Sequence, residues 1–129
     1  MPLNPGDPAP DFKVSDHTGK PVSLGDLRGK TTVLWFFPEA DTPGCTVEGC
    51  SFRDLNGDFK KKGAAIYGVS FDPPAKNQAF VEKYHFNFPL LCDTERKMGL
   101  AYGACDAPTD ASARRIGVVI DARGNIKEW

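Results

Sequence analysis

The stretch that decides the fold reads TTVLWFFPEADTPGC and runs from Thr31 to Cys45. Its first seven residues are rich in apolar, β-branched and aromatic side chains, and Pro38 ends the run. Such a run is typical of a strand that is buried on both faces of a sheet. A polar loop follows, and we expect a helix from about Cys45 to Lys62. The stretch therefore predicts a central strand, a loop and a helix, in that order.

The expected helix is amphipathic. Phe52, Leu55 and Phe59 follow one another at spacings of three and four residues, which predicts that they share one buried face. Gly63 is suited to end this helix. The next helix is expected to begin with Asp72 as its N-cap residue, ahead of two prolines that suit a first helical turn.

The remaining patterns complete an α/β architecture. The other expected elements are an N-terminal hairpin of residues 12–14 and 22–24, inner strands over 64–70 and 116–121, shorter strands over 88–92 and 126–129, and a helical turn over 97–102. Strands that alternate with helices predict a layered domain with a largely parallel central sheet. We expect residues 1–129 to form one domain, because this length leaves no room for two.

Composition excludes several classes of function. The sequence has 16 Lys and Arg residues and 17 Asp and Glu residues, which gives a net charge of -1. This balance argues against a general nucleic-acid binder or a polybasic membrane binder. No apolar run approaches the ~18 residues of a membrane span. Residues 1–7 lack the cationic and then apolar pattern of a secretory signal. We therefore expect a cytoplasmic protein.

Four cysteines remain as the chemical clue. Because cytosolic thiols are normally reduced, the close pair Cys45 and Cys50 favours a catalytic or metal-binding role over a structural disulfide. A zinc site needs about four ligands, and neither histidine lies near this pair, so we expect no metal and no cofactor. The C-x-x-C motif of a thioredoxin-type reductase is absent. Cys92 follows an apolar strand and reads as a core residue, and Cys105 reads as a bystander.

Cys45 occupies a chemically favourable position. It follows the carboxyl end of the central strand, where open α/β sheets place their active sites. In the first turn of a helix, unpaired backbone N–H groups and the positive end of the helix dipole favour a thiolate over a thiol. Thr42 lies three residues earlier and can point its hydroxyl into the same pocket. Pro38 lacks an N–H group and can form a wall of that pocket.

Pro38, Thr42 and Cys45 match the pattern P-x-x-x-T-x-x-C, and this segment resembles the active-site motif of the peroxiredoxins. With Cys50 on the same expected helix, the chain is similar to the Q type of that family, the bacterioferritin-comigratory-protein class. The resemblance extends to residues 6–12, 68–72, 88–91 and 115–121, listed in chain order. The family keeps an active-site arginine where Arg115 stands before the last inner strand, and the adjacent Arg114 is the alternative.

The resemblance implies a thioredoxin fold and the thiol-dependent reduction of hydrogen peroxide and organic hydroperoxides. Cys45 would be the nucleophile that becomes a sulfenic acid. The backbone N–H groups of Gly44 and Cys45, the Thr42 hydroxyl and the Arg115 guanidinium would bind the peroxide and stabilise its developing charge. Glu48 would border the substrate site and, together with Arg53, orient the arginine.

By the same resemblance, Cys50 would be the resolving cysteine. Five residues on an ideal helix separate two Cα atoms by ~8.6 Å, whereas a disulfide needs about 7 Å or less. We therefore expect the first turns of the helix to unwind in each cycle. Gly44 and Gly49 would ease this step, because each lowers helix stability by about 1 kcal/mol.

The expected partners are a peroxide and a thioredoxin or glutaredoxin-like reductant, with no nucleic acid and no membrane, and the protein is expected to be a monomer or weak homodimer. The family normally adds a helix after the last strand, which this sequence lacks after Trp129. Two alternatives stay open. One is a thiol–disulfide oxidoreductase without peroxidase activity, and the other is a redox-sensing interaction protein that uses the same fold without turnover.

Overall fold

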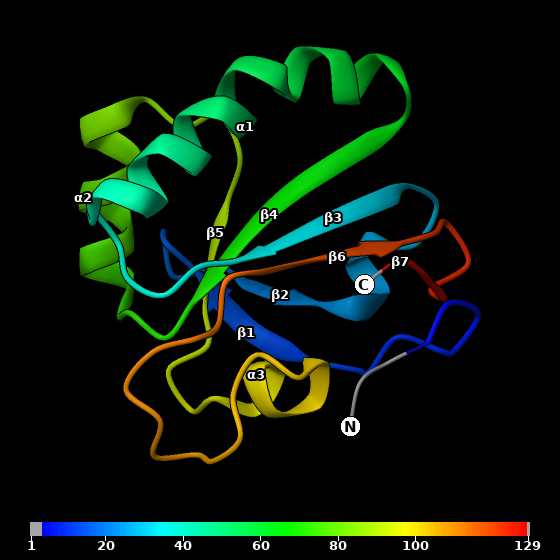
Figure 1. Ribbon diagram of the computed structural model, residues 1–129. Helices are drawn as coiled ribbons and strands as arrows, with labels where there is room; N and C mark the ends of the chain where they lie inside the picture. Colours follow the sequence, from blue (N-terminus) through cyan, green and yellow to red (C-terminus); the bar gives the residue numbers. More distant parts are fainter. Residues whose placement is uncertain (1–3, 129) are drawn as a thin grey trace.

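A seven-stranded mixed sheet runs through the middle of the computed structural model, which describes residues 4–128 (Figure 1). Its strands are β1 (Lys13–Asp16), β2 (Pro21–Ser23), β3 (Thr31–Phe36), β4 (Ala64–Ser70), β5 (Leu90–Cys92), β6 (Ile116–Ile120) and β7 (Ile126–Glu128). They lie in the order β2-β1-β5-β4-β3-β6-β7. The predicted N-terminal hairpin is confirmed as the antiparallel pair β1 and β2 at one edge.

The centre of the sheet is parallel, as predicted, but only over three strands. β4 pairs in parallel with β3 on one side and with β5 on the other. β6 runs antiparallel to β3, and its residue Ile116 lies opposite Phe36. This register brings the start of β6 to the carboxyl end of β3, where the loop to the next helix begins.

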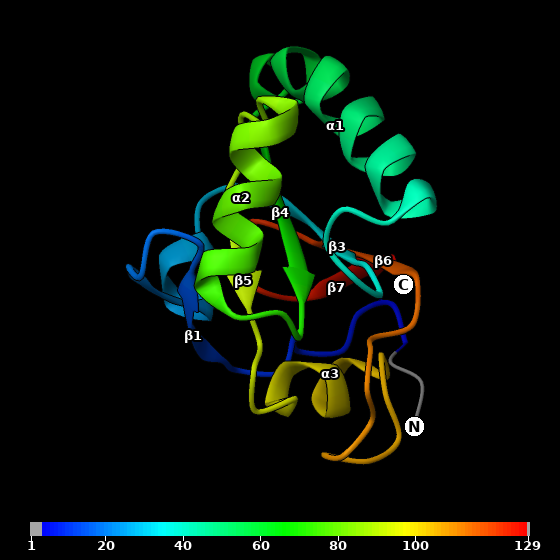
Figure 2. The ribbon, with the colours of Figure 1, turned by 90° about the vertical axis from the view of Figure 1, so that its left-hand side faces the viewer.

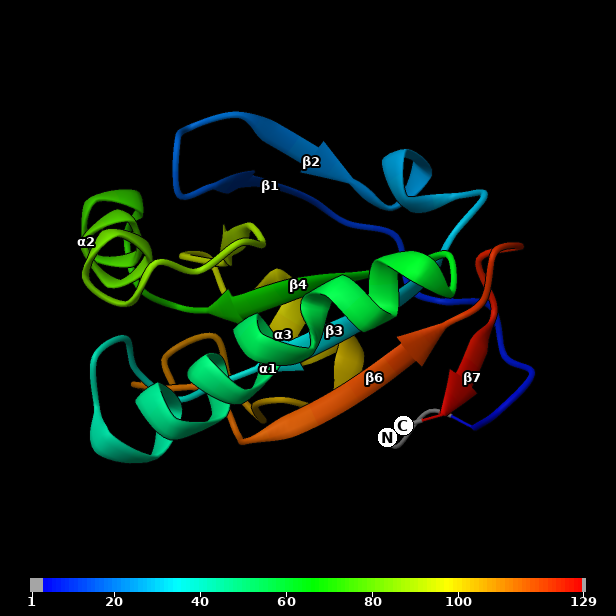
Figure 3. The ribbon, with the colours of Figure 1, turned by 90° about the horizontal axis from the view of Figure 1, so that it is seen from above.

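Helices cover both faces of the sheet. α1 (Pro43–Lys61) and α2 (Pro74–Tyr84) lie on one face, and the short α3 (Lys97–Tyr102) lies on the other (Figures 1 and 2). A single 3-10 turn, η1 (Leu24–Leu27), follows the hairpin. Seen from above, α1 extends along the central strands and α2 lies toward the hairpin side (Figure 3). Within residues 4–128, no helix combines the length and the apolar character that crossing a membrane requires.

Strand β3 is buried on both faces, as its sequence predicts. Leu34 and Phe36 join the core beneath α3, whereas Trp35 joins the core beneath α1 and α2, together with Phe37 just beyond the strand. Successive side chains of a strand point to opposite faces, so a strand between two helical layers needs apolar residues at every position.

Two local predictions about the helices are wrong. Leu55 does not share the buried face of α1, because its exposed fraction is 49%. The helix turns Cys45, Gly49 and Asn56 toward the sheet instead, with Phe52 and Phe59 partly buried beside them. The small Gly49 allows the closest approach, and this contact rather than the leucine spacing sets the orientation.

The second wrong prediction concerns Asp72, which does not cap α2. Pro73 is the N-cap residue of that helix, and the first helical residue is Pro74. The carboxylate of Asp72 accepts a hydrogen bond from the backbone N–H of Ala40 at 2.8 Å instead. A long-range contact has therefore taken the group that a local cap would use.

We predict opposite effects of the same substitution at two glycines of α1. A methyl group at Gly49 would lie 2.5 Å from Cζ of Phe86 and 3.1 Å from Cη2 of Trp35, whereas one at Gly57 would meet nothing within 4 Å. Gly49→Ala should lower the free energy of unfolding by about 1–3 kcal/mol through overpacking. Gly57→Ala should raise it by up to about 1 kcal/mol through higher helix propensity.

Chemical denaturation followed by circular dichroism measures both values. Equal effects at the two positions would contradict the close packing of Gly49 against the sheet.

Candidate active site

The candidate site lies where β3 ends and α1 begins. Thr42 is the N-cap residue of α1, Pro43 is its first residue, and Cys45 is in its first turn. The Cys45 side chain is fully buried, in the core that also holds Phe37 and Ala40. The N-cap residue does not cap the helix with its side chain. The backbone N–H groups of the first turn are thus not occupied by a side-chain cap, and the positive end of the helix dipole lies at this cysteine.

Arg115 brings a positive charge to this sulfur. Its Nη2 atom donates to Cys45 Sγ at 3.7 Å. The contact follows from the sheet register, because Arg115 immediately precedes Ile116, which pairs with Phe36 at the end of β3. Arg114 has a different environment, since its guanidinium contacts the Gly103 carbonyl and the Asp106 carboxylate. Of the two candidate arginines, the structure places Arg115 at the cysteine.

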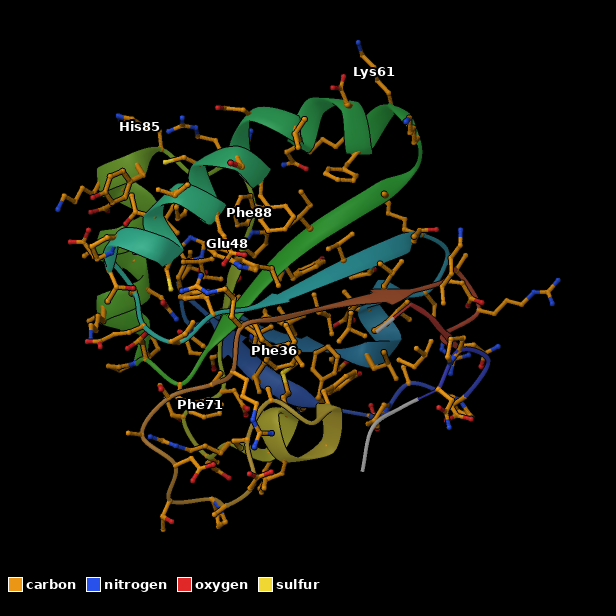
Figure 4. The ribbon with its side chains drawn as sticks, viewed as in Figure 1. Phe36, Glu48, Lys61, Phe71, His85 and Phe88 are labelled. Atoms are coloured by element: carbon orange, nitrogen blue, oxygen red, sulfur yellow. The ribbon has the colours of Figure 1, made fainter. Side chains whose placement is uncertain are left out.

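Glu48 holds the arginine in place. It lies three residues after Cys45 on α1, and its side chain reaches from the helix toward the sheet (Figure 4). Its Oε1 atom accepts hydrogen bonds from Arg115 Nη1 and, at 2.9 Å, from the Trp35 indole N–H. The Glu48 carboxylate, and after it the charge of Cys45, raises the pKa of the Arg115 guanidinium above its usual value. The guanidinium is thus charged at every working pH.

Arg53 does not take part in this arrangement. Its Nε atom donates to Asp54, and its Nη1 atom donates to the carbonyl of Tyr84 at 2.7 Å. The prediction that Arg53 helps to orient Arg115 is therefore wrong. The indole of Trp35 instead bonds to Glu48, which in turn holds Arg115. The sequence gives no sign of this bond, because Trp35 has the pattern of an ordinary core residue.

Gly44 leaves room for the guanidinium. A methyl group at this position would lie 2.8 Å from Arg115 Nη2. The family resemblance implies that the backbone N–H of Gly44 is directed at the substrate. The structure adds a steric reason for glycine, because any side chain here would displace the arginine from the sulfur.

The loop between β3 and α1 is fastened to α2. Lys76 pairs with Glu39 at 2.6 Å, and Lys83 pairs with Asp41 at 2.9 Å. Asp41 adopts a left-handed backbone conformation with φ of 62° and also accepts from the Tyr84 hydroxyl at 2.8 Å. The Lys83 ammonium, followed by that hydroxyl, lowers the pKa of Asp41.

Thr42 and Pro38 stand at the two ends of this loop. The Thr42 hydroxyl donates to the carbonyl of Glu39 at 2.8 Å. A hydroxyl has one proton and two acceptor positions, so in this arrangement Thr42 Oγ1 offers a ligand only acceptor positions. Pro38 is half-buried and follows Phe37 directly.

The other three cysteines lie in different surroundings. Cys50 is partly buried on α1, five residues after Cys45, and contacts the same core. Cys105 belongs to the core on the opposite face of the sheet. Cys92 ends β5 and accepts a hydrogen bond from Asn77 at 3.3 Å, and burial raises the pKa of its thiol. Among residues 4–128, no three side chains of His, Cys, Asp or Glu meet in a way that would hold a metal ion.

The chain matches known proteins over most of its length. The AhpC/TSA family matches residues 5–129. Peroxiredoxin Bcp of Escherichia coli K12 is 38% identical over 131 residues, which cover 98% of this chain and 84% of that protein. A Mycobacterium tuberculosis protein named as a peroxiredoxin is 45% identical over 102 residues, 79% of this chain and 65% of its own length. The chain thus covers slightly less than two thirds of that relative.

A solved structure extends the likeness to three dimensions. The crystal structure of a mutant of PrxQ from Xylella fastidiosa superposes with a TM-score of 0.91 at 26% identity and covers 99% of this chain and 85% of that one. The predicted thioredoxin-like fold, with its mixed sheet, flanking helices and N-terminal hairpin, is confirmed.

Fold, site and sequence together define a family. The chain belongs to the AhpC/TSA family. Within it, the chain is a peroxiredoxin of the Bcp/PrxQ class, as the motif formed by Pro38, Thr42 and Cys45 predicts.

Displacing the arginine should slow the reactions of Cys45. We expect Gly44→Ala to keep the fold, because the end of the Arg115 side chain can move away. The rate of Cys45 alkylation by iodoacetamide at neutral pH should fall about fivefold, as expected for the loss of ~1 kcal/mol from a half-exposed charge contact. The measurement uses a Cys50→Ser background, with Gly57→Ala as the matched control. An unchanged rate in Gly44→Ala would contradict a role for the arginine at the sulfur.

Proposed function

We propose that the protein is a thiol peroxidase that reduces hydrogen peroxide and organic hydroperoxides, with Cys45 as its nucleophile. The observation that carries the proposal is the contact of Arg115 Nη2 with the buried Cys45 sulfur at the start of α1. A cation and a helix N-terminus both stabilise a thiolate there, and burial excludes bulky competing substrates.

The first step transfers one oxygen atom to sulfur. The Cys45 thiolate attacks the terminal peroxide oxygen, which carries the hydrogen, an S–O bond forms and the O–O bond breaks. Sulfur loses two electrons to the peroxide and becomes a sulfenic acid. The leaving oxygen departs with the electron pair as hydroxide or alkoxide and takes a proton from solvent, giving water or an alcohol.

Donors fixed around the sulfur suit the charge that this step moves. Negative charge shifts from sulfur to the departing oxygen, and groups that are already oriented stabilise it without reorganising. The Arg115 guanidinium and the N–H groups of Gly44 and Cys45 supply such donors. Glu48 keeps the guanidinium in place through its own hydrogen bond, and the proposal assigns Pro38 and Thr42 to the border of the peroxide site.

Cys50 is the resolving cysteine in this proposal. Its thiolate attacks the Cys45 sulfenic sulfur, an S–S bond forms, and hydroxide leaves and becomes water. Both cysteines lie on α1, at a spacing that keeps their Cα atoms ~8.6 Å apart, so the helix has to unwind before the bond closes. Cys105 is a poorer candidate, since the sheet separates it from Cys45.

A dithiol partner completes the cycle. Thioredoxin or a glutaredoxin-like protein supplies two electrons and two protons, returns both cysteines to thiols and is itself oxidised to a disulfide. We place this cycle in the cytoplasm, where such reductants operate, and in a monomer or weak homodimer.

Peroxide should oxidise Cys45 quickly and consume two thiols per chain. One equivalent of hydrogen peroxide added to the reduced protein should give this loss within seconds. Thiol titration and intrinsic fluorescence measure it. Cys45→Ser should abolish the rapid reaction, because it removes the nucleophile. A wild-type rate no greater than that of free cysteine would refute the peroxidase and favour a redox-sensing or oxidoreductase role.

Loss of the resolving thiol should trap the intermediate. Cys50→Ser should keep the first oxidation fast and should accumulate a sulfenic acid that dimedone labels, detected by mass spectrometry. Cys105→Ser serves as the control and should still form the Cys45–Cys50 disulfide. An intramolecular disulfide in Cys50→Ser would instead identify Cys92 or Cys105 as the resolver.

Unwinding of α1 should be visible through Trp35. Its indole N–H donates to Glu48, which lies between the two cysteines, so disulfide formation should break this bond and alter the fluorescence. The chain has two tryptophans, and a Trp129→Phe background leaves Trp35 as the reporter. Disulfide formation should give a fluorescence phase slower than the first oxidation, and this phase should vanish in Cys50→Ser. If it persists in that variant, the fluorescence change does not report disulfide formation.

A further inference from the structure

One peptide group of the loop before α1 donates one hydrogen bond through its N–H and accepts another through its carbonyl. The N–H of Ala40 donates to Asp72 Oδ2 at 2.8 Å. The carbonyl of Glu39, which belongs to the same peptide bond, accepts from the Thr42 hydroxyl at 2.8 Å. A carboxylate at the end of β4 is therefore linked through a single rigid, planar unit to a hydroxyl at the start of α1.

The Asp72 carboxylate, at the start of this series of hydrogen bonds, is itself held in place. The side chain of Asp72 is only 10% exposed. The Ser70 hydroxyl donates to the same Oδ2 atom at 2.9 Å, and Lys76 Nζ lies 3.3 Å from Oδ1. Ser70 is fully buried and is in turn bonded to the fully buried Asn77 at 3.1 Å. Asp72 therefore has a fixed orientation toward Ala40.

This connection has an electrostatic consequence for Thr42. Hydrogen bonds to an ionised group are about twice as strong as those between neutral groups. A peptide whose N–H is bound by a carboxylate becomes a better acceptor at its carbonyl, because linked hydrogen bonds polarise one another. The Thr42 proton is thereby held on the Glu39 carbonyl, and the hydroxyl oxygen keeps only its acceptor positions for a ligand.

We propose that Asp72 is a positioning residue for peroxide reduction, which fixes the Thr42 hydroxyl through the 39–40 peptide group as the acceptor of the peroxide O–H. The proposal rests on the proposed peroxidase function and adds no covalent step to it. The oxygen that Cys45 attacks carries the hydrogen, so an acceptor at Thr42 holds this oxygen and leaves the other one to the donors around Arg115. The acceptor at Thr42 thereby favours the reaction of Cys45 with a peroxide over its reaction with a reagent that has no O–H group.

The key test compares two reagents for the same sulfur. Asp72→Asn keeps the size of the side chain and removes its charge. The second-order rate constant for oxidation of Cys45 by hydrogen peroxide should fall about tenfold, as for the exchange of a charge-assisted hydrogen bond for a neutral one. Alkylation by iodoacetamide, which needs no acceptor for an O–H group, should change less than twofold. Asp58→Asn makes the same change on an exposed part of α1 and should alter neither rate.

A double-mutant cycle separates positioning from a general structural role. Thr42→Val removes the hydroxyl and should slow peroxide oxidation strongly. Adding Asp72→Asn to Thr42→Val should then cost less than twofold, since Asp72 acts through that hydroxyl. If Asp72→Asn fails to fold, Ser70→Ala serves in its place. It removes one anchor of the carboxylate and should slow the peroxide reaction about threefold while leaving alkylation unchanged.

The outcomes are distinguishable. Equal losses in the peroxide and alkylation rates, a full tenfold loss of the peroxide rate in the Thr42→Val background, or no loss at all would each overturn the role of Asp72 while leaving the peroxidase intact. A wild-type protein that reacts with peroxide no faster than free cysteine would overturn the proposed function, and this inference with it.

Discussion

The contact between the Arg115 guanidinium and the Cys45 sulfur joins parts of the chain that are 70 residues apart. Three features are needed for it. The antiparallel register of β6 on β3 brings the arginine to the right end of the sheet, Gly44 leaves space for it, and Glu48 holds its other nitrogen. The fold thus places a charge that no local segment could place, and the proposed mechanism uses that charge at the cysteine.

Most of the architecture could be predicted from the sequence, because the pattern that specifies an inner strand is local. Residues 33–37 and 64–66 are apolar without interruption, and such continuous runs are typical of strands covered on both faces. The orientation of α1 was harder to predict. Leu55 has the right spacing to be buried, but the close fit of Gly49 against Phe86 decides which side of the helix meets the sheet.

The candidate site was predictable as far as its motif and the family resemblance reach, and the resemblance also points to Arg115 and Glu48 outside the motif. Thr42 and Cys45 share one short segment, so their proximity follows from chain connectivity. Trp35, Asp72 and Lys83 approach that segment through pairings of strands and helices, and each looks like an ordinary core, cap or surface residue in the sequence. Asp72 shows the physical reason: a carboxylate in the turn after a strand can serve the next helix or a neighbouring loop, and only tertiary structure decides between them.

The close fit of Gly49 has a consequence beyond stability. With no side chain of its own, this residue lets the aromatic rings of Phe86 and Trp35 touch the helix backbone. If the helical turns between the two cysteines unwind, those rings are no longer covered by the helix and become exposed to water. The disulfide form would then expose more apolar surface than the dithiol form. A reductant that binds apolar surfaces would therefore bind the oxidised protein in preference to the reduced one.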